Sequence, residues 1–369
     1  MKAFPAAAAL LRSGVTAAAF PGASIEVGRR ESVLWRGAFG SLTYDSDALP
    51  VEPETIFDLA SLTKVIATAT LMMRAVDDGL IGLADPVSNW ISEWRGSDRQ
   101  HVTIADLLAH SSGLTPYLPF YRDHTGRIEF QHAIATMPLE YTPGTKSVYS
   151  DLGFILLGFI LEDARSKISA QVGRGAFDPA DSLPVQFARI TSLITDQPLR
   201  FSPPRAWRHR TAPTEHDAWR GRTLVGEVHD ENAWALGGAA GHAGLFGTAA
   251  AVGAFARAAL HTITGTSLLA RVETMRRFIE RTHLATSSRA LGWDTMLPTS
   301  SCGTLMSPSS IGHTGFTGTS LWIDWERDAY VVLLTNRVHP TRENPLLKEL
   351  RPRIHDAVIE DLEGGAWRR

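Results

Sequence analysis

Ser61 and Lys64 are three residues apart in the stretch Ser-Leu-Thr-Lys, and together they could perform nucleophilic catalysis. On a helix, residues three apart share a face, so the serine hydroxyl and the lysine amine can meet. A serine hydroxyl is a poor nucleophile until a nearby base takes its proton. Lysine can be that base where burial or positive neighbours lower its pKa. The spacing by itself is common in proteins, and an ordinary helix start would also explain it.

Two further segments carry side chains that could act with this pair. Tyr149 and Asp151 come directly before an apolar stretch, and a loop ahead of a helix can direct a phenol and a carboxylate into a cleft. His313, Thr314 and Gly315 precede a predicted hairpin, and a glycine at a strand edge permits close backbone approach by a ligand. An isolated tyrosine would be interpreted as a half-buried aromatic with its hydroxyl in water. The combination of the three segments favours a shared catalytic site.

Strands near both ends of the chain would support these residues. Two β-prone runs, 24–27 and 32–35, flank a short polar turn and predict an antiparallel hairpin. A second hairpin is predicted from residues 320–323 and 330–334. A closing helix is predicted over 345–362, with Leu346, Leu350, Ile354 and Val358 at helical spacing. The pattern predicts one antiparallel sheet built from both termini.

The middle of the chain is predicted to be mostly helical. A helix is predicted over 63–78, with Ser61 just ahead of its start and Gly79 as its stop. Further helices are predicted over 104–110, 152–165 and 249–260. We therefore expect a mixed α/β (α+β) fold with a discontinuous sheet domain, residues 1–70 and 285–369, and a mostly helical domain, residues 71–284. A cleft between two such lobes is a common place for a small-molecule site.

Composition excludes several classes of partner. The 369 residues are 44% hydrophobic and 20% charged with a net charge of −3, so no basic stripe points to nucleic acid. No apolar stretch is long and hydrophobic enough to predict a membrane span. The single cysteine, Cys302, matches no catalytic cysteine motif and excludes an intrachain disulfide. We expect a small-molecule or peptide substrate, and the sequence does not predict the oligomeric state.

The amino-terminal segment is predicted to be a short amphipathic helix. Its apolar run, residues 6–11, is shorter than the hydrophobic region of a signal peptide and is interrupted by Arg12. We interpret this end as part of the mature protein and predict a cytoplasmic location.

The three segments, taken in chain order, resemble the signature of active-site serine enzymes that include class C β-lactamases, DD-peptidases and β-lactamase-like carboxylesterases. The residues that carry the resemblance are Ser61 with Lys64, Tyr149 with Asp151, and His313-Thr314-Gly315. Similarity extends to residues 103–114, 143–158 and 312–336. Roughly residues 20 to 360 are covered, and the combined signal is strong although each motif is short.

The resemblance implies a role for each matched residue. Ser61 would be acylated by the substrate, while Lys64 and Tyr149 would move protons to and from it. The backbone N–H groups of Ser61 and Phe316 would form the oxyanion hole, where a donor contributes about 3–4 kcal/mol. The side chains that would line the cleft beside the substrate are Asp151, His313 and Thr314, with Gly315 at the strand edge.

Two of the matched positions depart from the family pattern. Asp151 stands where the family more often has asparagine, and an ionised carboxylate can only accept hydrogen bonds. His313 stands where lysine is commoner in β-lactamases and DD-peptidases, and a neutral histidine would hold a substrate carboxylate less well. Both changes count against efficient β-lactamase activity, but they leave the acylation machinery intact.

Residues 226–233 and 237–244 resemble a pattern in a narrower subgroup, which includes penicillin-binding-protein 4B-like proteins and muropeptide-recycling amidases. The resemblance favours His229 and His242 as residues that shape and polarise the substrate cleft. With Asp230 and Glu231 they could instead bind a metal, but their spacing matches no standard zinc motif. We predict no metal and no other cofactor.

The sequence therefore predicts a serine hydrolase that cleaves an amide or ester through an acyl-enzyme on Ser61. The substrate would be a cell-wall-derived peptide, a muropeptide or a small ester. A DD-carboxypeptidase or a weak β-lactamase is the alternative among enzymes. A binding protein that kept the fold and lost turnover is the alternative outside them, because fold does not fix function.

Overall fold

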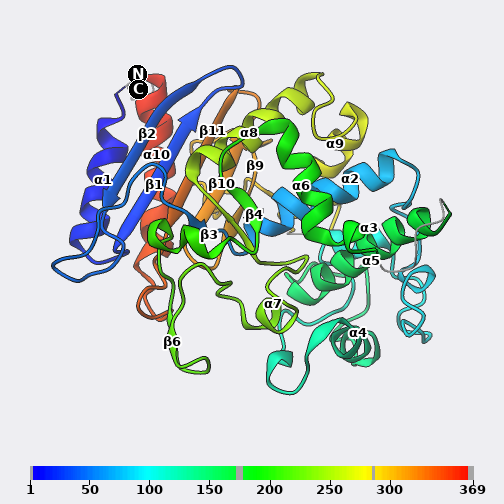
Figure 1. Cartoon of the computed structure of the whole chain (residues 1–369). Coiled ribbons are helices and arrows are strands. Elements are labelled where there is room, and N and C mark those ends of the chain that lie inside the picture. Colours follow the sequence, from blue (N-terminus) through cyan, green and yellow to red (C-terminus); the bar gives the residue numbers. More distant parts are fainter. Residues whose placement is uncertain (1–2, 172–177, 285–286, 365–369) are drawn as a thin grey trace.

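A six-stranded antiparallel sheet with helices on both faces forms one side of the molecule (Figure 1). The computed structural model describes residues 3–171, 178–284 and 287–364. The strand order is β2-β1-β11-β10-β9-β8. The strands are β1 (Gly22–Gly28), β2 (Val33–Gly40), β8 (Asp294–Thr295), β9 (Ile311–Gly315), β10 (Thr319–Asp324) and β11 (Ala329–Thr335). Because β1 pairs with β11, the sheet joins the two ends of the chain as predicted, and both predicted hairpins are confirmed.

Helices on the two faces of this sheet bury alternate residues of the same strand. Helices α1 (Pro5–Thr16) and α10 (Leu346–Glu363) pack against Val331 and Leu333 of β11, and α8 (Ala249–Thr264) packs with Val332 and Leu334. A strand buried on both faces has an unbroken apolar sequence, which explains the run at 330–334. The predicted amino-terminal helix is confirmed as α1.

The buried face of α10 differs from the prediction at its first residue. Leu346 is 45% exposed, whereas Leu347 is buried. The helix begins directly after Pro345, and its buried stripe runs through Leu347, Ile354 and Val358. Leu346 therefore lies at the exposed start of the helix and is not part of its buried stripe.

The middle of the chain forms the helical part. Its longer helices are α2 (Thr70–Asp77), α4 (Gly126–Thr136), α5 (Asp151–Gln171), α6 (Leu183–Ile194), α8 and α9 (Val272–Ile279). Shorter helices are α3 (Ile104–Leu108), α7 (Glu231–Ala235) and the 3₁₀ turns Val87–Asn89, Phe120–Arg122, Pro179–Asp181 and Arg205–Arg210. Small strands complete it: β3 (Phe57–Asp58) and β4 (Leu199–Phe201) flank β7 (Leu245–Gly247), and β5 (His216–Asp217) pairs with β6 (Arg222–Thr223).

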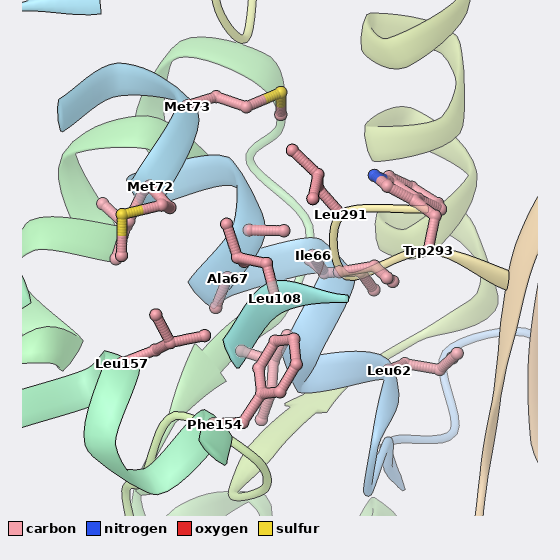
Figure 2. Packing of buried hydrophobic residues seen from close by; sticks show 14 of the residues in the cluster. Leu62, Ile66, Ala67, Met72, Met73, Leu108, Phe154, Leu157, Leu291 and Trp293 are labelled. Atoms are coloured by element: carbon pink, nitrogen blue, oxygen red, sulfur yellow. The ribbon is translucent and has the colours of Figure 1, made fainter. Parts of the chain in front are cut away.

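The helix that follows the nucleophile crosses the hydrophobic core. Its first part, Lys64–Ala69, is a π-helix that continues into α2. Figure 2 shows Ile66 and Ala67 of this segment, and Leu62 just before it, surrounded by side chains from other elements, among them Phe154 of α5. All six residues of the π-helix are buried. Short π-helical segments occur frequently at functional sites, and one buried on all sides holds its residues rigidly.

Helix α8 lies on the sheet, although it belongs to the segment 71–284 that we expected to form the helical domain. The division into two domains stays a prediction. Within the described residues, no helix combines the length and apolarity needed to cross a membrane.

Candidate active site

Ser61 lies in a turn directly before the buried helix, and the backbone ahead of it is constrained. Ala60 has φ 46°, a left-handed conformation that costs a residue with a side chain about 1 kcal/mol or more. The Ala60 N–H donates to Asp58 Oδ1 at 2.8 Å, and this buried carboxylate also accepts from the His229 N–H at 2.7 Å. Asp58 therefore fixes the turn that presents the serine hydroxyl.

Lys64 is fully buried and reaches three oxygen atoms. Its Nζ atom donates to Ser61 Oγ at 2.9 Å and to the backbone carbonyl of His242 at 3.1 Å. The same nitrogen lies 2.7 Å from Asp151 Oδ1, as an ion pair rather than an aligned hydrogen bond. Burial lowers the pKa of Lys64, but the effects of Asp151, the larger, and Tyr149 together outweigh it, so the pKa is raised above its ordinary value. Lys64 is thus held as an ammonium, so the condition under which a lysine alone could act as the base, a lowered pKa, is not met in the resting site.

Tyr149 packs between two buried histidines beside the lysine. Its ring centroid lies 4.7 Å from that of His110 and 5.7 Å from that of His313, and Lys64 Nζ lies 5.0 Å from its ring centroid. Burial raises the pKa of the Tyr149 phenol, although the Lys64 charge and hydrogen bonding with Lys64 and Ser61 oppose this. His110 also accepts the Ser150 N–H on Nδ1 at 3.0 Å, so it positions the segment that carries Tyr149.

The end of β9 and the turn that leads into β10 lie directly against the turn that carries Ser61. Thr319 Oγ1 donates to the Leu59 carbonyl at 3.0 Å, and Thr317 Oγ1 donates to the Asp58 carbonyl at 2.7 Å. A Cβ on Gly315 would lie 2.5 Å from the Leu59 carbonyl oxygen, so only glycine permits this approach. In the part of the chain that the structure describes, the N–H groups of Ser61 and Phe316 donate to no protein atom. This pair of free donors is what an oxyanion hole requires.

His313 carries no charge at this site. Its Nδ1 atom lies 2.8 Å from the Thr314 carbonyl, which identifies Nδ1 as the protonated nitrogen. Burial holds the pKa of His313 well below its ordinary value, and the nearby charges of Arg289 and Lys64 lower it further. The neutral histidine expected from the sequence is therefore supported by its surroundings.

Arg289 supplies a cation that the sequence analysis missed. Its guanidinium lies over the Tyr149 ring, 5.0 Å from the centroid, and lines the same cleft as His313. No carboxylate among the described residues forms an ion pair with it. No local pattern marks residue 289, because its neighbours in the site come from distant segments.

His229 and His242, from the segments 226–233 and 237–244, occupy different places. His229 lines the cleft, pairs with Glu215 at 3.0 Å and stacks on the Phe316 ring with centroids 5.6 Å apart. His242 is buried behind the cleft wall, and its Nε2 lies 2.8 Å from Asp230 Oδ1. Through its carbonyl, His242 also fixes Lys64.

These residues meet in one cleft of about 880 Å³. It brings together Ser61, Tyr149, Asp151, His229, His313, Thr314, Gly315 and Phe316 with Arg289. Asp230 and Glu231 lie in its wall, and Glu231 pairs with Arg342 at 2.7 Å. No cluster of three or more His, Cys, Asp or Glu suited to a metal ion occurs within residues 3–171, 178–284 and 287–364.

Ser61 and Tyr149 thus share one cleft, with the buried Lys64 in contact with Ser61, and comparison with known families agrees with this arrangement. The family model named Beta-lactamase matches residues 7–354. The chain belongs to the β-lactamase family. The resemblance inferred from the three motifs is confirmed, and the chain is a serine hydrolase of this family.

Relatives and solved structures agree with this assignment. A protein named putative D-alanyl-D-alanine carboxypeptidase from Escherichia coli K12 is 30% identical over 359 residues, covering 88% of this chain and 80% of the relative. A class C β-lactamase from Rhodobacter sphaeroides has a TM-score of 0.71 at 19% identity, covering 97% of this chain and 99% of that one. Simvastatin synthase (LovD) from Aspergillus terreus has a TM-score of 0.72 at 17% identity, covering 98% of each chain. These structures confirm the β-lactamase/DD-peptidase fold.

Proposed function

We propose that this hydrolase removes the last residue of a peptide that ends in a free carboxylate, in the manner of a D-alanyl-D-alanine carboxypeptidase. The observation that carries the proposal is Arg289, a cation that forms no ion pair within the described residues and lines the cleft beside a neutral His313. A guanidinium binds a carboxylate through two parallel hydrogen bonds. The name of the 30% identical relatives supports the same substrate class.

The contacts around Ser61 support the following role for each neighbour. The Ser61 Oγ atom attacks the scissile carbonyl carbon, and its proton passes to the group formed by Lys64 and Tyr149. The negative oxygen of the tetrahedral intermediate accepts hydrogen bonds from the Ser61 and Phe316 N–H groups. The leaving amine takes the proton as the C–N bond breaks, which leaves an ester on Ser61. Water then attacks this ester and gives up a proton to the same group. The C–O bond to Ser61 breaks, the Ser61 Oγ atom takes this proton back, and the acid product departs.

Lys64 and Tyr149 lose and gain protons together, as one titrating unit. In the resting enzyme the ammonium of Lys64 is paired with Asp151, and the phenol of Tyr149 is neutral because burial raises its pKa. The unit must lose one proton before it can accept the proton of Ser61. Because the two groups lie in contact, that proton belongs to the pair rather than to either residue.

The nucleophile is tested by intact-mass analysis after incubation with a fluorophosphonate probe. A single adduct is expected on the wild type and none on the Ser61→Ala variant. Absence of an adduct on well-folded wild type would favour a binding protein that has lost turnover.

The role of Arg289 is tested with one peptide in two forms, a free carboxylate and its carboxy-terminal amide. The wild type is expected to prefer the acid. Arg289→Ala is expected to lose that preference, because its KM for the acid should be about 10- to 100-fold higher than that of the wild type. Arg277→Ala, a change of an exposed arginine on α9, is the matched control. Equal cleavage of acid and amide by the wild type would contradict the proposal.

The cytoplasmic location stays a prediction that cell fractionation tests.

A further inference from the structure

Arg337 has a buried guanidinium that binds backbone carbonyls and forms no ion pair with a carboxylate of the described residues. It follows β11 and is 7% exposed. Its Nη2 atom donates to the Phe316 carbonyl at 2.7 Å, and its Nη1 atom donates to the carbonyls of Arg342 and Asn344 at 3.0 and 3.1 Å. A buried cation without a counter-ion costs free energy, so the three carbonyls must replace the water that the guanidinium has lost.

Phe316 is difficult to hold in place, because its N–H group must stay free for the oxyanion. No protein atom in the described chain accepts that N–H, so the residue is not secured through it. Packing alone holds it weakly, since Phe316 is 49% exposed. Among the described residues, the Arg337 guanidinium is the only donor to the Phe316 carbonyl. The position of this backbone therefore depends on the contact with Arg337.

Phe316 lies in the turn between β9 and β10. The Gly318 N–H donates to the Gly315 carbonyl at 3.0 Å, which closes a β-turn. Phe316 and Thr317 are its two central residues. The peptide between two such residues can rotate between the orientations of turn types I and II. The hydrogen bond from Arg337 falls on the carbonyl of this peptide and opposes the rotation.

The end of β11 and the stem of Arg337 also hold this turn. Thr335 Oγ1 donates to the Gly318 carbonyl at 3.0 Å. Gly318 has φ 108°, and a Cβ there would lie 2.7 Å from Arg337 Cγ, so the arginine stem packs closely on the turn. The Arg337 guanidinium lies over the Phe316 ring, 4.9 Å from its centroid. Arg337 therefore contacts both the backbone and the side chain of Phe316.

We infer that Arg337 is a positioning residue for the oxyanion hole, which orients the Phe316 N–H toward the oxygen that becomes negative when Ser61 attacks. This inference rests on the acylation step proposed above, but it does not depend on which ester or peptide is cleaved. A donor stabilises the transition state only where it is already in place, and a small misplacement costs much of the rate.

The first test is the Arg337→Met variant, which removes the donors and keeps most of the stem. With p-nitrophenyl acetate, kcat/KM is expected to fall about 10- to 100-fold, less than for a donor removed outright. The Kd of phenylboronic acid is expected to rise by a similar factor. Its boron forms a bond with Ser61 Oγ, the serine proton passes to the Lys64–Tyr149 unit, and a hydroxyl of the resulting boronate anion occupies the oxyanion hole.

Arg99→Met is the matched control. Arg99 is 6% exposed and binds the carbonyls of Ala135 and Met137 at 2.8 and 2.9 Å, with Asp98 as its ion-pair partner. It does not line the catalytic cleft. The control is expected to lower the melting temperature and to leave both kcat/KM and the Kd of phenylboronic acid unchanged.

Chemical rescue separates positioning from a general loss of structure. Arg337 lines the cleft, so Arg337→Ala opens the place of its guanidinium to solvent. Guanidinium chloride at millimolar concentration, far below a denaturing level, is expected to restore part of kcat/KM in Arg337→Ala and to leave the wild type unchanged. Arg337→Lys keeps the charge without the planar fork and is expected to lose less than Arg337→Met in both measurements.

Two results would overturn the inference. One is normal kcat/KM in folded Arg337→Met, and the other is a fall in kcat/KM with no change in the Kd of phenylboronic acid. If Arg337→Met does not fold, the same comparison on Arg337→Lys decides, because the two quantities must change by a common factor. If the wild type cleaves the ester but no peptide with a free carboxylate, the proposed function fails, whereas parallel losses in the Arg337 variants still support the positioning role.

Discussion

Replacement of Asp151 by asparagine is expected to move the activity of this enzyme toward lower pH. The Asp151 Oδ1 atom lies 2.7 Å from the Lys64 Nζ atom, and the lysine is fully buried. The carboxylate raises the pKa of Lys64. Asparagine has nearly the same shape and no charge, so Asp151→Asn removes the electrostatic effect with little change in packing.

The magnitude follows from the contact distance. Two unit charges 2.7 Å apart attract by about 6 kcal/mol at an effective dielectric constant of about 20. The Asp151 side chain is 18% exposed, so solvent screens part of this attraction. An opposite charge in contact typically shifts a pKa by about 1–3 units. We expect the midpoint of the rising limb of kcat/KM to fall by about the same 1–3 pH units.

The sign follows from the proton count. Activity requires the Lys64–Tyr149 unit to lose a proton, and the carboxylate of Asp151 retains that proton on the lysine. Without the carboxylate the proton leaves at lower pH, so the variant is active in a range where the wild type is not.

The assay is kcat/KM for a small ester, measured across the pH range in which both proteins stay folded. Asp294→Asn is the control, because Asp294 is a carboxylate of the same cleft that forms no ion pair with Lys64 in the described chain. Its midpoint is expected to remain that of the wild type. An unchanged or higher midpoint in Asp151→Asn would refute the reasoning.

Three further changes test the site and its support. Lys64→Ala is expected to lower kcat by about 10²–10⁴-fold with little change in melting temperature, and near-normal turnover would exclude the lysine from proton transfer. Glu26→Ala removes a fully buried carboxylate that binds two arginines, so urea unfolding is expected to show a loss of about 3 kcal/mol, against almost none for the exposed Glu31→Ala. Gly241→Ala would place a Cβ 2.0 Å from a carbonyl oxygen of α5, so its free energy of unfolding in urea is expected to fall by more than about 3 kcal/mol. Gly144→Ala has open space around it and should lose about 1 kcal/mol in the same assay. Equal effects of the paired changes would contradict the packing described.

Local sequence predicted the elements that depend on near neighbours. The two hairpins and the terminal helices are visible in apolar periodicity, because a strand or a helix buries one side of itself at a fixed spacing. Helix α3 ends at Leu108, earlier than predicted, since His110 has φ 57°. The π-helical form of 64–69 was not predicted, because it depends on packing from several elements.

The sequence by itself determined the chemical groups of the site: a serine three residues before a lysine, a tyrosine before a helix, and a glycine at a strand edge. Only the tertiary structure decided the charge state of those groups and the neighbours that set it. It places Asp151 against Lys64, so the lysine is an ammonium rather than a free base, and it brings Arg289 over Tyr149 beside a neutral histidine. The charge of a titratable group depends on burial and on neighbours a few ångströms away, and those neighbours come from segments far apart in the chain.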